Sequence, residues 1–179
     1  LLTAKYEKDP ECLKCHTTGY GQETGYKDKE TSSNLAGTTC EACHGPGAAH
    51  AKKPAKGESR APILNFGKDA WTPAKDQNRK CLECHTNHQR IEWKGSLHEF
   101  SDVACASCHQ VHVAHDPVLD REQQPDVCYR CHLSQRAQFY QNSRHPVREG
   151  KMAWSSCHDP HGDEGTDRLV KASLREPCT

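Results

Sequence analysis

One five-residue pattern, Cys-x-x-Cys-His, occurs five times and constrains what this chain can fold into more than any other feature. Each copy places two thiols one helical turn apart, so both can add to the vinyl groups of a single porphyrin. A single copy could equally be a redox dithiol or half of a zinc site. Five copies, each followed at once by His, indicate covalently attached haem c. The copies are Cys12/Cys15/His16, Cys40/Cys43/His44, Cys81/Cys84/His85, Cys105/Cys108/His109 and Cys128/Cys131/His132.

The composition agrees with a core that is not made of protein. Only 34% of the 179 residues are hydrophobic, with three Phe and one Met, and the mean hydropathy is −0.96. By itself this composition is typical of a chain too polar to fold. Porphyrins supply the missing apolar surface. We therefore expect a mostly irregular multihaem cytochrome with short α-helices, a haem-stacked core, little or no β-sheet, and no stable fold without haem.

Charge and cysteine usage indicate the compartment and the kind of partner. The 24 basic and 24 acidic residues cancel, which argues against nucleic acid as a partner. Haem c is attached outside the cytoplasm, so we expect a periplasmic or outer-membrane associated protein. Leu1–Lys5 is too short for a signal peptide, so the chain is interpreted as a mature or trimmed form. No apolar run approaches the roughly 20 residues of a membrane helix.

The motif spacing divides the chain into three segments. Residues 1–50 are an N-terminal two-haem segment, 51–80 an extended Pro/Lys-rich linker, and 81–179 a haem-dense segment with at least four sites. The linker is either solvated or packed on haems. Helices are expected over 89–100 and 133–145. The linker residues expected to touch porphyrin are Ile63, Leu64, Phe66 and Trp71.

An internal repeat predicts a sixth site. The stretch from Ser96 to His112 aligns with that from Ser143 to His161, and Trp154 then stands where the first Cys belongs. Cys157 and His158 are intact, so one thioether and one histidine would hold the sixth haem. The alternatives are an incidental Cys-His pair or an altered residue at 154. Cys178 either opens a seventh motif that the chain end cuts or is a lone thiol.

The histidine count matches six irons with two imidazoles each. Thirteen His are present, six of them directly after an attachment cysteine, His158 included. The single Met152 cannot supply six second ligands, so bis-His coordination is the economical interpretation. Such ligation predicts low potentials and saturated irons, which suit an electron relay better than catalysis. The seven candidate distal ligands are His50, His88, His98, His112, His115, His145 and His161.

Spacing limits how these ligands pair. His85/His88, His109/His112 and His158/His161 each stand three residues apart, on one face of a helical turn. Such a pair can hardly straddle one porphyrin, so the second His should reach a neighbouring haem. His115 competes with His112 and is the weakest candidate.

Several segments resemble the decahaem periplasmic cytochromes of the MtrA/DmsE type. They are Val103–Ala114 with Asp116–Leu119, Cys40–Pro46 and Cys157–Gly162, and the resemblance covers residues 36–179. The segment 12–21 is also similar to one in tetrahaem cytochromes. The resemblance implies electron transfer through bis-His haems. It implies a periplasmic or inner-membrane donor, an outer-membrane or extracellular cytochrome as partner and, for some members, a surrounding outer-membrane β-barrel. The distal ligands it favours are His50, His98, His112, His145 and His161.

Departures from the family leave other interpretations open. The chain has about half the expected motifs, so it is a fragment or a shorter relative, and Trp154 breaks a motif. The main alternative is a multihaem oxidoreductase acting on a small nitrogen or sulfur compound, which needs an iron with an open position. Others are a subunit of an extracellular haem filament and a zinc-binding module.

Overall fold

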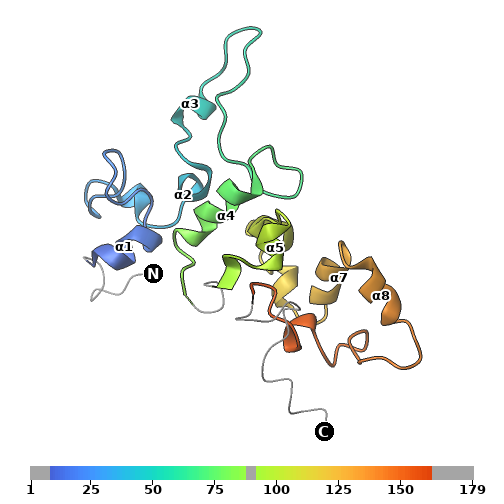
Figure 1. The fold of residues 1–179 in the computed structure, drawn as a ribbon. Coiled ribbons are helices and arrows are strands. Elements are labelled where there is room, and N and C mark those ends of the chain that lie inside the picture. Colours follow the sequence, from blue (N-terminus) through green and yellow to red (C-terminus); the bar gives the residue numbers. More distant parts are fainter. Residues whose placement is uncertain (1–8, 88–91, 163–179) are drawn as a thin grey trace. The chain divides into compact units, whose positions relative to one another are not determined.

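The computed structural model describes residues 9–87 and 92–162, which contain short helices and no strand (Figure 1). This confirms the predicted fold class. None of the helices in the described ranges is long and apolar enough to cross a membrane. The elements are α1 (Pro10–His16), η1 (Ser33–Leu35), α2 (Cys40–His44), α3 (Ala48–Ala51), α4 (Ala74–Leu82), α5 (Leu97–Phe100), α6 (Cys105–Cys108), η3 (Pro117–Leu119), α7 (Gln124–Tyr129), α8 (Leu133–Gln138) and η4 (Trp154–Ser156).

Local sequence explains why these helices begin and end where they do. The Asp9 side chain caps α1 by accepting a hydrogen bond from the Glu11 amide at 2.9 Å. Helix α2 ends at Gly45, whose φ of +79° favours glycine. Helix α4 begins after Pro73, so the linker expected to be extended to residue 80 is helical over its last part.

Two further helices are shorter than the sequence suggested. The expected helix 133–145 is observed only as α8, and of 89–100 only α5 is an α-helix in the described part. Beyond Gln138 the chain carries Gln141, Asn142 and Ser143, of which Asn and Ser are weak helix formers. The Phe139 ring packs instead on Tyr129, with centroids 6.1 Å apart.

The chain forms two compact units. The first unit comprises residues 1–66 and 70–85, and the second unit comprises 67–69 and 86–179. The sequence division placed the Cys81–His85 motif at the start of the haem-dense segment, whereas the structure groups it with the first two motifs. Each unit thus contains three Cys-His attachment segments, counting Cys157-His158.

The protein core of the described residues is very small. No described side chain is less than 2% exposed. In the second unit, α7 contacts η3, α8 and η4, and the rings of Tyr129, Phe139 and Trp154 lie 5.8 to 6.1 Å apart. The described buried hydrophobic residues are Leu13, Tyr26, Trp93, Ala104, Val127, Tyr129, Val147 and Ala153.

Candidate haem-binding sites

The attachment motifs share one backbone turn. In three of them the histidine amide donates to the carbonyl of the first cysteine, at 3.0 Å for His85, 2.9 Å for His109 and 3.0 Å for His132. In α1 and α2 the whole motif lies inside the helix. This turn puts both thiols on one face, with the imidazole next to them. None of the eleven described cysteines forms a disulfide, so the thiols suit thioether attachment.

The sixth segment repeats the same turn with Trp154 in the place of the first cysteine. The Cys157 and His158 amides donate to the Trp154 carbonyl at 3.0 and 2.9 Å. The equivalent bonds to Cys128 are 3.2 and 3.0 Å. The Trp154 ring lies 5.4 Å from that of His132 and 5.9 Å from that of His158. The backbone is therefore that of an attachment site, while the first side chain packs instead of bonding.

Thiols from different motifs lie close together within the first unit. The Cys15 thiol points at the carbonyls of Cys84 and Glu83, at 3.9 and 4.0 Å. Burial, followed by contact with Cys15, raises the pKa of Cys84 to about 11. The first and third motifs therefore adjoin, which would bring their haems close to each other.

In the second unit burial has the same effect on a thiol. Burial, followed by the nearby Cys108, raises the pKa of Cys128 to about 11. Burial also raises the pKa of Cys108, with Cys131 adding to it. The fourth and fifth motifs therefore adjoin as well, in a partly buried setting where the neutral thiol is favoured.

Several histidines have their Nδ1 engaged, which leaves Nε2 as the metal-binding nitrogen. Nδ1 of His44 bonds the Leu64 carbonyl at 2.6 Å, and Nδ1 of His50 bonds the Ala61 carbonyl at 2.7 Å. In the second unit, Nδ1 of His98 bonds the carbonyl of Pro160 at 2.8 Å. Hydrogen bonds at Nδ1 orient a ring and fix its tautomer for metal binding.

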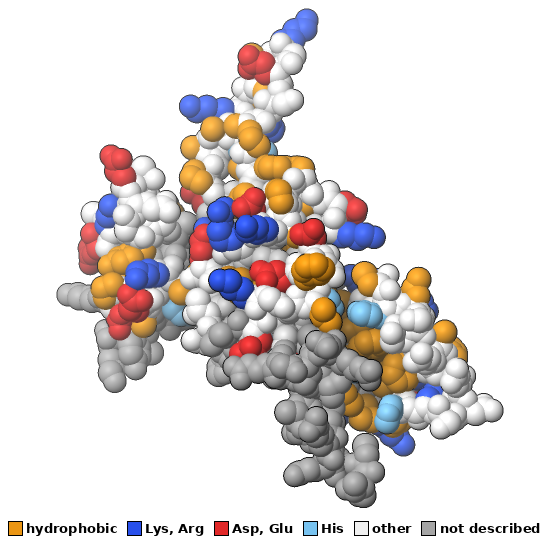
Figure 2. Space-filling model, in the orientation of Figure 1, with side chains coloured by type: hydrophobic (Ala, Val, Ile, Leu, Met, Phe, Trp, Pro, Cys, Tyr) orange, Lys and Arg blue, Asp and Glu red, His pale blue; other side chains and the backbone are white. Residues whose placement is uncertain are grey.

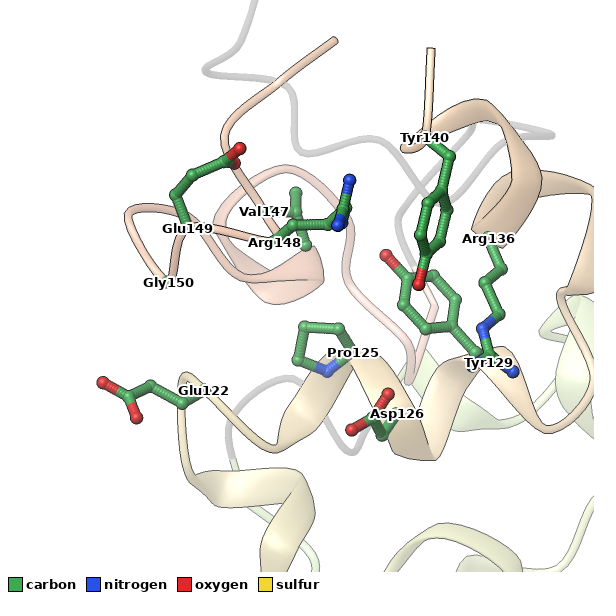
Figure 3. A pocket seen from close by; sticks show the side chains of 10 residues that line it. All are labelled: Glu122, Pro125, Asp126, Tyr129, Arg136, Tyr140, Val147, Arg148, Glu149 and Gly150. Atoms are coloured by element: carbon green, nitrogen blue, oxygen red, sulfur yellow. The ribbon is translucent and has the colours of Figure 1, made fainter.

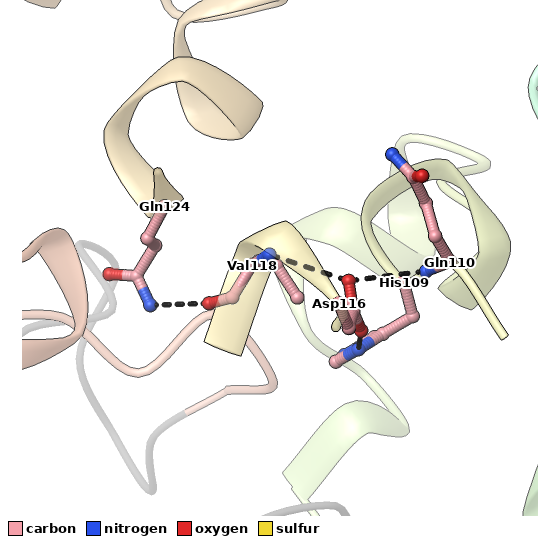
Figure 4. Close-up of polar contacts among 5 residues, drawn as sticks. All are labelled: His109, Gln110, Asp116, Val118 and Gln124. Atoms are coloured by element: carbon pink, nitrogen blue, oxygen red, sulfur yellow. Dashed lines mark hydrogen bonds and ion pairs between the residues drawn. The ribbon is translucent and has the colours of Figure 1, made fainter. Parts of the chain in front are cut away.

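His109 differs because its Nδ1 meets a carboxylate. The distance to Asp116 Oδ2 is 2.8 Å (Figure 4). Asp116 is the N-cap of η3, and its Oδ1 accepts hydrogen bonds from the Gln110 and Val118 amides at 3.2 and 3.3 Å. The Gln124 side chain then ties the Val118 carbonyl to α7 at 2.8 Å. The carboxylate is thus fixed against the imidazole.

Two pairs of histidine rings from distant segments face each other in the second unit. His109 and His161 have ring centroids 6.1 Å apart and planes 6° from parallel. His98 and His132 have the same separation, with planes at 69°. Each pair joins a motif histidine to a candidate distal histidine.

A close backbone approach helps to bring His161 to this place. A Cβ on Gly162 would overlap the Glu92 carbonyl oxygen, and the φ of Gly162 is +125°. The neighbouring Trp93 ring lies 6.4 Å from both His98 and His161. Glycine at 162 therefore lets residues 161 and 162 reach the segment that also carries His98.

Apolar residues that flank candidate ligands are exposed. Leu97 and Leu133 are 51% and 63% exposed, next to His98 and His132. Val111 and Val113 on either side of His112 are 78% and 45% exposed. Figure 2 shows hydrophobic and histidine side chains together on this part of the surface. A porphyrin lying against these residues would remove their apolar surface from water.

Five other predicted ligands lie at the surface of the described structure: His16, His85, His112, His115 and His145. The exposed motif cysteines are Cys40, Cys43, Cys84 and Cys131. His88 and Cys178 lie outside the described residues. The distal roles predicted for these histidines, and the seventh site, stay predictions.

A pocket of about 450 Å³ lies on another face of α7 (Figure 3). Pro125 and Asp126, with Tyr129 one turn further along α7, line it, whereas Cys128 and Cys131 share a different face. The Arg148 guanidinium lies 4.0 Å from the centre of the Tyr140 ring. This charged pocket was not predicted from the sequence. Its full lining is Glu122, Pro125, Asp126, Tyr129, Arg136, Tyr140, Val147, Arg148, Glu149 and Gly150.

Two family models match the chain. Residues 2–45 match the family described as cytochrome c554 and c-prime. Residues 40–123 match the family described as cytochrome c-type protein NrfB-like. Together they cover the first four motifs.

Similar curated proteins extend this likeness along the chain. Multiheme cytochrome MtrA of Shewanella baltica is 41% identical over 93% of this chain and 50% of its own length. Cytochrome c-554 of Nitrosomonas europaea is 35% identical over 51% of this chain and 41% of its own. Cytochrome c-type protein NrfB of Escherichia coli is 28% identical over 75% of this chain and 71% of its own length. The chain spans 50% of the length of the MtrA relative and 41% of the length of cytochrome c-554.

Proposed function

Because the chain belongs to the multihaem c-type cytochromes and carries haem c, we propose that it relays electrons through closely spaced haems with two histidine ligands each. The relay runs across the periplasm or the outer membrane, to or from an extracellular redox partner. The donor is a periplasmic or inner-membrane redox protein. The length and identity of the match to MtrA support this route.

The two ring pairs of the second unit carry the proposal. A metal–imidazole bond is about 2.0–2.1 Å and the ring centre lies roughly 1 Å further on, so two imidazoles on one iron have centroids roughly 6 Å apart. The pairs His109/His161 and His98/His132 both have centroids 6.1 Å apart. We therefore assign His161 to the haem of Cys105/Cys108, and His98 to the haem of Cys128/Cys131.

These pairs also support the idea that neighbouring segments share haems. His161 follows His158 by three residues but lies beside His109, and His98 precedes its partner by 34 positions in the sequence. Each pair would clamp two separate segments through one iron. This explains how a chain with so few buried side chains forms a compact unit.

The chemistry that haem c supplies when bound is the one-electron exchange between ferric and ferrous iron. Two histidines of this chain would hold each iron, which would exclude substrate from the metal. The exposed leucines and valines beside the ligands would cover the porphyrin edges. Thioether links at six segments fix the spacing of the redox centres, with Cys157-His158 as the sixth.

The experiment that tests the proposal is the reaction of the reduced, loaded protein with carbon monoxide. An electron relay with two histidines per iron gives no change in the Soret spectrum and no high-spin signal when oxidised. One haem that takes up carbon monoxide would instead favour an oxidoreductase for a small nitrogen or sulfur compound. For an electron relay, stopped-flow measurements should also show every haem reduced and reoxidised without a small-molecule substrate.

A further inference from the structure

We propose that Asp116 and Asp159 set the haem held between His109 and His161 at a more negative potential than the neighbouring haem held between His98 and His132. The inference rests on the proposed pairing of these histidines. It adds two positioning residues that act on the iron through its ligands, and it predicts which of these two haems is reduced later.

The first observation is the charge on the proximal side. The Asp116 carboxylate accepts a hydrogen bond from Nδ1 of His109 at 2.8 Å, and its side chain is 14% exposed. A carboxylate in this position draws the Nδ1 proton towards itself and makes the ring a stronger electron donor. A stronger donor stabilises ferric iron over ferrous iron, which lowers the potential.

The second observation is the charge on the opposite side. Asp159 Oδ1 lies 3.5 Å from Nδ1 of His161, and the Asp159 side chain is 7% exposed. The same oxygen accepts a hydrogen bond from the His161 amide at 3.0 Å. Both imidazoles of one proposed iron thus face largely buried carboxylates, where charges interact more strongly than in water.

The neighbouring pair has neutral partners. Nδ1 of His98 bonds the backbone carbonyl of Pro160 at 2.8 Å. The His132 ring lies beside the Trp154 indole, with centroids 5.4 Å apart. Neither contact brings a formal charge to the ligand. Two adjacent haems with the same ligand types therefore differ in the charge behind those ligands.

The consequence is a built-in step between adjacent haems. Each takes one electron from its redox partner and gives one up, with no bond formed or broken. An electron shared between these two haems would reside mainly on the His98/His132 haem and occupy the His109/His161 haem only in transit. The ring planes also distinguish the two, at 69° and 6°. Near-perpendicular and parallel imidazoles give different low-spin EPR signals, so each haem can be followed separately.

The test is an EPR-monitored redox titration of the loaded full chain and of Asp116→Asn. Asparagine keeps the shape and an acceptor oxygen but removes the charge. In the wild type, we expect the haem with the parallel-plane signal to be reduced at a lower potential than the haem with the perpendicular signal. In Asp116→Asn its reduction equilibrium constant should rise about tenfold, which is about 59 mV for one electron. The perpendicular signal should move much less, and Asp116→Glu should restore the wild-type value.

Asp120→Asn is the matched control. Asp120 also caps a turn, accepting from the Glu122 and Gln123 amides at 2.8 and 3.0 Å, but it contacts no histidine in the described structure. If Asp120→Asn moves the same potential as much as Asp116→Asn, the charge on His109 is not the cause and the inference is wrong.

A second variant keeps the inference testable should Asp116→Asn not assemble. Methionine as a ligand raises haem potential, so His161→Met should raise the lower of the two potentials. If it raises the higher one, the assignment is wrong. Unmoved potentials in a fully loaded, low-spin Asp116→Asn protein overturn this inference alone. High-spin haem in the wild type overturns the proposed function itself.

Discussion

The first and second units hold their histidines by different means. In the first unit, His44 and His50 bond backbone carbonyls of the 61–64 segment, and the Phe66 ring lies 5.3 Å from His44. In the second unit, two pairs of histidine rings have centroids 6.1 Å apart, and two of these histidines face carboxylates. The first unit thus orients its ligands with neutral groups, and the second adds charge. Haems of identical chemistry can acquire different potentials in this way.

The largest expected effect concerns the sixth attachment segment. Replacing Cys157 by Ala removes the only thiol of the Trp154–His158 turn, so the purified protein should contain one haem fewer. Intact mass measures this directly. Cys131→Ala is the matched control, because the fifth motif keeps Cys128 and should retain its haem by one thioether. An unchanged haem number in Cys157→Ala would mean that the second unit has two sites and not three.

The next effect tests whether both units use two histidines per iron. His98→Ala in the second unit and His50→Ala in the first should each leave one iron with an open position. EPR should then show one high-spin haem, and the reduced protein should bind one carbon monoxide. A high-spin signal in His98→Ala but not in His50→Ala would restrict histidine pairing to the second unit.

A smaller effect is expected where the chain must approach closely in the second unit. In Gly162→Ala the new Cβ would overlap the Glu92 carbonyl oxygen. The backbone must shift, at a cost of about 1–3 kcal/mol, and His161 should bind less well. The measurement is the fraction of the parallel-plane EPR signal that becomes high-spin on warming. In Gly150→Ala, where the nearest atom is in the Glu122 side chain at 3.6 Å, the parallel-plane signal should stay fully low-spin.

The smallest effect concerns the neutral network of the first unit. Thr72 is 2% exposed, and its hydroxyl bonds Asn65 at 2.7 Å next to the Leu64 carbonyl that orients His44. Thr72→Val should lower the free energy of unfolding by about 1 kcal/mol and therefore lower the thermal midpoint. The haem potentials of the second unit should stay unchanged. Thr72→Ser, which keeps the hydroxyl, should retain that bond. A shift of the His109/His161 potential in Thr72→Val would contradict the separation of the two units.

The attachment sites could be predicted from the sequence because each is a local pattern. Two thiols and an imidazole within five residues define one turn, and even the turn at Trp154 could be read from the repeat. The short helices followed from the same motifs. The prediction that residues 51–80 are extended was wrong for their last part, because α4 begins directly after Pro73.

What the sequence could not supply depends on contacts between distant residues. His109 and His161 are 52 positions apart, and no periodicity joins them. Asp116 looked like an ordinary turn residue before Pro117, and only the folded loop brings its second oxygen to His109. Gly162 is informative only once its distance to Glu92 is known. The third motif joined the first unit because its neighbours in space are not its neighbours in sequence.

The most direct test of histidine pairing is near-infrared magnetic circular dichroism of the oxidised, fully loaded protein. Each axial ligand set gives a charge-transfer band at its own wavelength, and intact mass supplies the number of haems. We predict that the bis-imidazole band accounts for every haem in the chain. Intensity in the histidine–methionine or high-spin bands, equal to one haem or more, would contradict the account.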